Sequence, residues 1–421
     1  MGGLVAIFNF LGLICVIFGL ISLFYLPLAL FFEWRRPKGS FTCTPLVSIV
    51  IPAYNEERVI VHCLDSIVGS HYSKLEIIVV DDGSTDNTLS VLREHQARWQ
   101  EAGADKEYFQ LKICSQGNKG KAAALNRGIA KSKGEFIFLV DADGVFTPYA
   151  IGQMLRGFTK KCVGAVCGND RPVNIHNLQT RWLNLQTHVT TALARRALAF
   201  VGCLPIVSGN IGAFRRSTLR RVGPLVENIL GEDLELTWRV QRAGYDVNFV
   251  PEALVLAEVP KDLSGLWQQR VRWARGFLQT TKIHRDMFFK GKYGPFAFYL
   301  PFNVFCMVVL PLVQLGILAL LPVMYHLGFQ PIPTSLFPLL CWLGLIFAFL
   351  ISIAAIALDK AWGELKDLYV IPLWAFYSLF LNVVMLWSII LELRRTPASW
   401  NKLERTGIIS RGKERCEHGG D

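Results

Sequence analysis

The chain has 421 residues, of which 18% are charged and 52% are hydrophobic, and its mean hydropathy is +0.34. These values exclude a disordered or collagen-like chain, and they are too apolar for a wholly soluble enzyme. The formal net charge of +11 favours an anionic partner, either nucleic acid or the inner face of a membrane. The ten cysteines include no C-x-x-C pair, so the sequence predicts neither a disulfide scaffold nor a zinc site.

The apolar residues are concentrated in a few long segments. Residues 4–32 contain no charged side chain and are longer than the roughly 20 residues that cross a bilayer. This length favours an uncleaved transmembrane helix in the N-terminal region 1–36 over a signal peptide. A second apolar region, 293–391, predicts about three further crossings, at 304–325, 335–357 and 368–391, with residues 293–303 along the membrane interface.

Basic residues lie on both sides of a polar region at about 40–260. Basic residues mark the cytoplasmic side of membrane segments, so we expect this region in the cytoplasm of a multi-pass protein of the inner or plasma membrane. Four crossings would place both ends of the chain outside. The tail 392–421 carries seven lysine and arginine residues, which indicates the opposite side, so the side of the tail stays open.

The polar region alternates between short apolar runs and amphipathic segments. Such alternation is typical of an α/β fold in which helices cover a parallel sheet. The predicted strands are 46–51, 75–80, 109–114 and 136–140, and the predicted helices are 57–69, 88–98 and 122–130.

Acidic residues directly follow two of these strands, as Asp81-Asp82 and as Asp141-Ala-Asp143. One such pair alone is usually a helix cap or a turn. Two clusters at the same sheet edge repel each other unless positive charge lies between them. Carboxylates suit Mg²⁺ or Mn²⁺, and the loop 118–121 with its two lysines would add positive charge for a diphosphate.

These stretches resemble the nucleotide-sugar half of the family 2 glycosyltransferases, which have the GT-A fold. The matching stretches are Val50–Glu56, Val80–Ser84, Gly117–Lys121 and Asp141–Asp143. The resemblance implies a donor site and a metal site that binds Mg²⁺ or Mn²⁺ at Asp143 and Asp141. The implied donor-binding residues are Ala53, Tyr54, Glu56, Asp81, Asp82, Lys119 and Asp141.

The second half resembles the processive members of the same family. Ser208 and Gly209 match an acceptor-side loop, and Gly231-Glu232-Asp233 stands where those members carry Thr-Glu-Asp. The Q-x-x-R-W signature follows as Gln269, Arg272 and Trp273, which the resemblance assigns to the diphosphate and the acceptor sugar. The departure at Gly231 leaves the acid pair intact.

The acid pair predicts the chemistry of the transfer. Asp233 would be the general base, with Glu232 beside it, and a base at neutral pH needs a pKa raised by partial burial or by that neighbour. A single displacement would then invert the anomeric centre. The same two acids also fit the start of a helix over 234–240, and both interpretations can hold together.

Region 261–292 is amphipathic, with apolar residues at helical spacing and several arginines. This pattern is typical of a helix seated in the membrane interface. The resemblance adds that Arg272 meets the diphosphate and Trp273 stacks on the acceptor sugar. We expect both roles.

The nearest resemblance within the family is to bacterial poly-β-1,6-N-acetylglucosamine synthases. It implies a processive, inverting transferase that extends a β-linked polysaccharide from a UDP-sugar, first UDP-N-acetylglucosamine, and passes the chain through its own helices. The implied partners are the UDP-sugar, the growing glycan or a lipid acceptor, membrane lipid and accessory secretion subunits, with no nucleic acid. Two alternatives stay open: a non-processive transferase that adds one sugar to a lipid, and a catalytically inactive transport or scaffold subunit.

Overall fold

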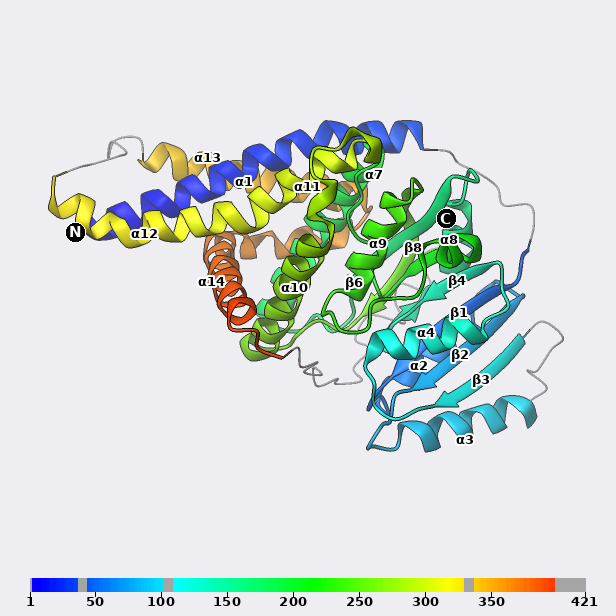
Figure 1. Ribbon diagram of the computed structural model, residues 1–421. Coiled ribbons are helices and arrows are strands. Elements are labelled where there is room, and N and C mark those ends of the chain that lie inside the picture. The colour runs from blue at the N-terminus through cyan, green and yellow to red at the C-terminus, as the bar shows by residue number, and fades with distance from the viewer. Residues whose placement is uncertain (1, 37–43, 102–108, 329–336, 398–421) are drawn as a thin grey trace. The chain divides into compact units, whose positions relative to one another are not determined.

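A computed structural model describes residues 2–36, 44–101, 109–328 and 337–397 (Figure 1). The chain divides into two compact units. The sheet unit comprises Arg36–Ile175 and Gly202–Lys261. The helical unit comprises residues 2–35, His176–Val201 and Asp262–Pro397.

The sheet unit contains one eight-stranded sheet with the order β3-β2-β1-β4-β7-β6-β8-β5. The first four strands run parallel, as the sequence predicts. The sheet as a whole is mixed, however, because β7 runs antiparallel to both β4 and β6, and β5 runs antiparallel to β8. The expectation of a parallel sheet therefore holds for its first four strands and for the β6–β8 pair, which also runs parallel. The strands are β1 Val47–Ala53, β2 Leu75–Asp81, β3 Phe109–Ser115, β4 Phe136–Leu139, β5 Val145–Phe146, β6 Val163–Pro172, β7 Gly212–Arg215 and β8 Asp246–Ala257.

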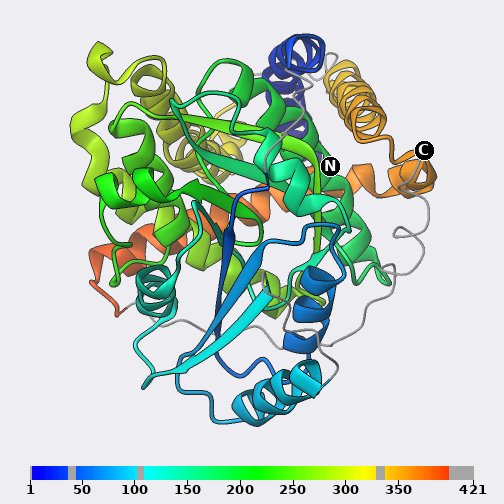
Figure 2. The ribbon, with the colours of Figure 1, turned by 90° about the vertical axis from the view of Figure 1, so that its right-hand side faces the viewer.

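Helices cover both faces of the parallel strands, with α4 on one face and α2 on the other (Figures 1 and 2). The three helices predicted from the sequence are present as α2, α3 and α4, and their bounds differ by a few residues from the predicted ones. The helices of this unit are α2 Ile60–Val68, α3 Thr88–Glu101, α4 Lys121–Lys131, α5 Ala150–Arg156, α8 Arg216–Val222 and α9 Glu232–Arg242.

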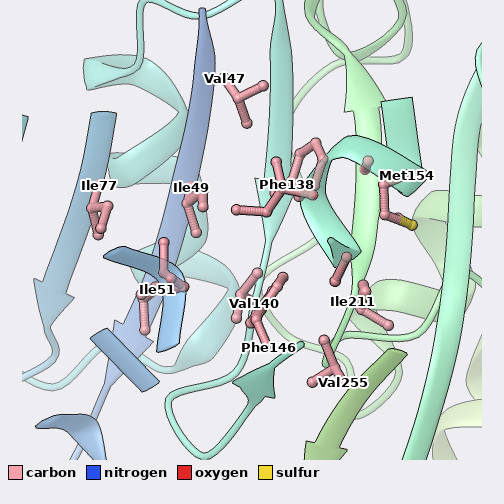
Figure 3. Packing of buried hydrophobic residues seen from close by; sticks show 14 of the residues in the cluster. Val47, Ile49, Ile51, Ile77, Phe138, Val140, Phe146, Met154, Ile211 and Val255 are labelled. Atoms are coloured by element: carbon pink, nitrogen blue, oxygen red, sulfur yellow. The ribbon is translucent and has the colours of Figure 1, made fainter. Parts of the chain in front are cut away.

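The core of the sheet unit follows from the alternation of side chains along a strand. Ile49 and Ile51 belong to the apolar cluster that also contains Phe138 and the residues of α2 (Figure 3). Val50 points to the other face, where a Cβ placed on Gly128 of α4 would lie 2.2 Å from Val50 Cγ1. The absence of a side chain at Gly128 therefore lets α4 pack directly on β1.

The helical unit is built mainly from apolar helices. Two continuous runs in the described residues, Phe296–Met324 and Trp362–Leu393, are long and apolar enough to cross a membrane, and Trp342–Leu358 is a shorter apolar segment. Residues 296–303, expected at the interface, belong to the same helical run as the crossing expected at 304–325. The helices are α1 Gly2–Arg35, α6 Leu178–Thr187, η1 His188–Arg195, α7 Arg196–Phe200, α10 Leu263–His284, η2 Arg285–Met287, η3 Gly291–Tyr293, α11 Phe296–Val304, η4 Phe305–Val309, α12 Leu310–His326, α13 Phe337–Leu358, η6 Trp362–Leu373 and α14 Trp374–Leu393. Residues 335–336 of the crossing expected at 335–357 and residues 398–421 of the tail lie outside the described residues.

A buried ionic network links the helices of this unit. His188 is fully buried, with Nδ1 2.9 Å from Asp359 Oδ2 and Nε2 2.6 Å from Glu364 Oε2. Arg196 also contacts Asp359, at 3.0 Å, and pairs with Glu33 at the end of α1. A neutral imidazole donates through one nitrogen only, so a proton must lie in each of the two carboxylate contacts of His188. A neutral imidazole supplies only one of these two protons, so the second is carried either by the ring, as imidazolium, or by one of the two carboxyl groups.

Candidate active site

The carboxyl ends of β1, β2 and β4 meet at one edge of the sheet. The register pairs Ala53 with Asp81 and Val50 with Leu139, so the segments that follow these strands leave the sheet side by side. The structure thus places the acidic clusters that follow β2 and β4 at the same edge, as parallel strands require.

The two acids after β2 are both buried, and they have different surroundings. Asp82 accepts hydrogen bonds from the backbone N–H groups of Lys119 and Gly120, at 2.9 and 2.8 Å, and from Gln116 Nε2 at 2.8 Å. Asp81 accepts a bond from Ser115 Oγ at 3.1 Å. Asp82 therefore fixes the loop that precedes α4. In that loop Lys119 contributes its backbone N–H to Asp82, and the residue is exposed.

The loop after β1 carries Ala53, Tyr54 and Glu56 and is held against the loop after β2. Asn55 adopts a left-handed backbone with φ 56°, which asparagine tolerates. Its side-chain oxygen accepts a hydrogen bond from the Thr85 N–H at 2.7 Å. The Glu56 N–H donates to Thr88 Oγ1 at 2.7 Å, so the two predicted donor-site loops form one connected structure.

Lys121, the first residue of α4, joins the acids from two distant parts of the chain. Its Nζ lies 2.7 Å from Asp141 Oδ1 and 3.1 Å from Glu232 Oε1. Although burial lowers the pKa of Lys121, the neighbouring Asp141, Glu232 and Asp233 hold it above its ordinary value. Lys121 belongs to the loop singled out in the sequence, but the donor site predicted from it names Lys119 instead. A small pocket surrounds this group, lined by Lys121, Leu125, Leu139, Asp141, Val207, Ser208, Gly209, Phe214, Leu225, Glu232, Asp233 and Leu236.

Asp233 has the protonation behaviour expected of a base that works near neutral pH. Burial, and then the adjacent Glu232, raise its pKa from 3.8 to about 6, against the opposing effect of Lys121. Both acids lie in the first turn of α9, where the helix dipole favours negative charge. Gly231 precedes them and has no side chain to cap the helix. The two interpretations of the acid pair are thus compatible, and the catalytic role of Asp233 stays a prediction.

The donor set after β4 fits a hard divalent cation. Asp143 is 7% exposed, and Asp141 contributes the pocket carboxylate. The described residues contain no group of three or more histidine, cysteine or acidic side chains that could hold a metal. Mg²⁺ and Mn²⁺ sites of this chemical class need only one or two carboxylates, because substrate phosphates and water complete the shell. Burial raises the pKa of the nearby Cys63 thiol, and the negative charges of Asp143, Asp141 and Glu56 raise it further.

Gly209 brings the acceptor-side loop close to these charges. A Cβ at this position would lie 3.0 Å from Lys121 Nζ and 3.4 Å from Asp141 Oδ2. The glycine therefore allows the backbone of the Ser208–Gly209 loop to form one wall of the pocket. This contact places both predicted acceptor-side residues beside Asp141 and the acids of α9.

The Q-x-x-R-W residues belong to the helical unit. Gln269, Arg272 and Trp273 all lie on α10, which begins after Asp262, whose side chain accepts a hydrogen bond from the Gly265 N–H. Trp273 is 50% exposed, and the Arg270 guanidinium lies 4.3 Å from its ring centroid. An exposed indole held by a stacked cation is suited to bind a further flat surface. The assignment of these three residues to the acceptor and the diphosphate stays a prediction.

Comparison with known proteins identifies the family. Residues 48–223 match the family described as Glycosyl transferase family 2, and residues 136–390 match Glycosyl transferase family group 2. The chain is 29% identical over 390 residues to the probable glycosyltransferase YdaM of Bacillus subtilis (strain 168), with 89% of each chain covered. It is 31% identical over 231 residues to the poly-beta-1,6-N-acetyl-D-glucosamine synthase of Staphylococcus epidermidis. That match spans 55% of this chain and 54% of the relative, about half the length of each.

A solved structure with the same fold is the mannosyltransferase PcManGT from Pyrobaculum calidifontis in complex with GDP-Man and Mn²⁺. Its TM-score is 0.55 at 20% identity, and the match covers 92% of this chain and 99% of the other. This likeness confirms the GT-A fold predicted from the sequence. Since a family match covers more than half of the chain, the protein belongs to the family 2 glycosyltransferases.

Proposed function

We propose that the protein is a processive, inverting glycosyltransferase that polymerises a β-linked polysaccharide from UDP-N-acetylglucosamine. The observation that carries this proposal is the pocket in which Asp233, with a pKa raised to about 6, lies near Lys121 and Asp141. The similarity to poly-beta-1,6-N-acetyl-D-glucosamine synthases supports the choice of sugar and of polymer. UDP-glucose is the second donor to test.

In this mechanism the acceptor hydroxyl attacks the anomeric carbon of the donor while the bond to the diphosphate breaks. Asp233 accepts the hydroxyl proton, and the nucleoside diphosphate leaves with the electrons of the broken bond. One displacement on an α-linked donor gives a β-linked product. Burial, and then Glu232, keep the pKa of Asp233 high, and Lys121 contributes positive charge beside the leaving group.

A divalent cation held by Asp143 and Asp141 would supply further electrostatic stabilisation of the leaving diphosphate. The loops after β1 and β2, with Ala53, Tyr54, Glu56, Asp81 and Asp82, would bind the nucleotide. Lys119, in the loop between β3 and α4, would face the donor from solvent. Gln269, Arg272 and Trp273 would bind the diphosphate and the acceptor sugar from α10.

We place the reaction at the cytoplasmic face of the membrane, with the apolar helices as the anchor and as the path for the growing glycan. The two long apolar runs Phe296–Met324 and Trp362–Leu393 support a membrane location. The basic residues around the polar region support its cytoplasmic side. Accessory secretion subunits and membrane lipid are the partners that this location implies.

The test incubates the full chain, purified in detergent, with radiolabelled UDP-N-acetylglucosamine or UDP-glucose and with Mg²⁺ or Mn²⁺. A long polymer from one donor is the expected product. A single lipid-linked sugar would replace the proposal with the non-processive alternative, and no product from either donor would favour the inactive subunit. Asp233→Asn is expected to abolish turnover, while Asp246→Asn, on the exposed end of β8, serves as the matched control.

A further inference from the structure

Helix α9 begins at the pocket and also holds the loop on the opposite wall. Thr237 lies one turn after Asp233 and is fully buried. Its hydroxyl accepts a hydrogen bond from the Val207 N–H at 2.9 Å and donates one to the Asp233 backbone carbonyl at 2.7 Å. A hydroxyl has one proton to donate and lone pairs to accept, so both bonds form together. A single oxygen atom thus joins the residue before Ser208 to the proposed base.

The earlier part of the same loop is held by other side chains of α9. Trp238 Nε1 donates to the Pro205 carbonyl at 3.1 Å, and Gln241 Nε2 donates to the Leu204 carbonyl at 2.7 Å. These two bonds do not involve the pocket residues Ser208 and Gly209. Loss of the Thr237 hydroxyl would therefore release the end of the loop next to the pocket and leave its beginning in place.

The position of the Ser208–Gly209 segment is important because it lies beside Lys121 and Asp141. The Gly209 backbone lies so close to Lys121 and Asp141 that even a Cβ would crowd them. Ser208 itself donates its N–H to Cys167 Sγ at 3.4 Å, a weak acceptor, and its carbonyl accepts a bond from the Ile211 N–H at 3.2 Å. A small shift of this segment would change the distance between the acceptor-side wall and the acids of α9.

We infer that Thr237 is a positioning residue for glycosyl transfer, which holds the Ser208–Gly209 wall at a fixed distance from Asp233. The inference rests on the proposed function, in which Asp233 is the base and the Ser208–Gly209 loop faces the acceptor. Thr237 contacts both backbone groups through its hydroxyl. Serine keeps this hydroxyl and should preserve both hydrogen bonds, whereas valine has the same shape without the hydroxyl and should lose them.

The test compares Thr237→Val, Thr237→Ser and the control Gln241→Met in the full chain in detergent. Gln241→Met removes a bond of the same kind from the same helix to the same loop, but farther from the pocket. Thr237→Val is expected to lower kcat about 10- to 100-fold, because misplacement of reacting groups by a fraction of an ångström has effects of this size. The donor KM should change less than about threefold, since the hydroxyl of Thr237 bonds to Val207 and Asp233 and not to the nucleotide loops, and Thr237→Ser should restore kcat to within about threefold.

Hydrogen–deuterium exchange gives a second readout that does not depend on turnover. Thr237→Val should speed exchange of the Val207 amide, whereas Thr237→Ser and Gln241→Met should leave it protected. Equal kcat in Thr237→Val and Gln241→Met, or no rescue by serine, would overturn the inference. If the wild-type protein formed no product, the proposed function would fail, and with it the role of Thr237 in transfer. The Val207 exchange separates the two failures, because unchanged protection in Thr237→Val would refute the hold of Thr237 on the loop even if the wild-type protein made product.

Discussion

The raised pKa of Asp233 predicts where the activity falls as the pH is lowered. A general base must be deprotonated, and burial together with Glu232 raises its pKa to about 6. With that value about 90% of the base is active at pH 7, about half at pH 6 and about one tenth at pH 5. An aspartate with an ordinary pKa near 3.9 would instead stay almost fully active at pH 5.

The fall in activity at low pH forms the acid limb of the pH–rate profile. Two neighbours of Asp233 should move the midpoint of this limb in opposite directions. Glu232 raises the pKa of Asp233, so Glu232→Gln should shift the limb to lower pH. Lys121 lowers it, so Lys121→Met should shift the limb to higher pH. Each variant also lowers the maximal rate, because both side chains lie in the pocket, and the comparison therefore uses the midpoint of the limb and not its height.

The assay measures initial rates of sugar transfer between pH 4.5 and 8 at saturating donor and a fixed saturating concentration of Mn²⁺. Lys131→Met, at the far end of α4, is the control for the loss of a lysine from this helix. Samples returned to pH 7.5 after each incubation must recover full activity, which separates titration from unfolding. A wild-type midpoint below about pH 4.5, or shifts of the same sign in both variants, would refute the assignment of Asp233 as the base.

Three further predictions concern stability and metal dependence. His188→Gln should lower the free energy of unfolding by about 3–5 kcal/mol, because it leaves Asp359 and Glu364 short of a buried partner, and a thermal melt that matches wild type would contradict the network. Gly128→Ala should cost about 1–3 kcal/mol, because its Cβ would overlap Val50, and denaturant unfolding of the two proteins measures the difference. Removal of divalent cations with EDTA should abolish transfer, and added Mg²⁺ or Mn²⁺ should restore it; full activity in EDTA would exclude the metal site at Asp141 and Asp143.

The first half of the sheet could be predicted from sequence because its strands are short, largely apolar segments bounded by polar loops. Strands β1 and β2 are rich in β-branched residues, and β4 is wholly aromatic and aliphatic. The second half could not be predicted in this way. Strand β5 has only two residues and β7 has four, so neither has a recognisable period. Strand β6 contains two glycines and ends at Pro172, which weakens the pattern further.

The candidate site was predictable where one chain segment defines it and unpredictable where folding brings segments together. The acids after β2 and β4 follow directly from the strand ends. The contacts of Lys121 could not be predicted from sequence, since Lys119 and Lys121 lie only two residues apart in the same stretch. Only the folded chain shows that Gly120, with φ 92°, ends the loop and that Lys121 starts α4 facing Asp141. The pairing of His188 with Asp359 spans more than 170 positions and has no local signal.

The charges of the pocket predict that Lys121 alone is insufficient to bind an anionic donor. Asp141, Asp143, Glu232 and Asp233 gather at this edge of the sheet, and Lys121 is shared between two of them. A diphosphate would add negative charge beside these carboxylates, and like charges at short distance repel each other. We therefore expect donor binding to need further positive charge, which in the proposed mechanism Arg272 and a divalent cation held by Asp141 and Asp143 would supply.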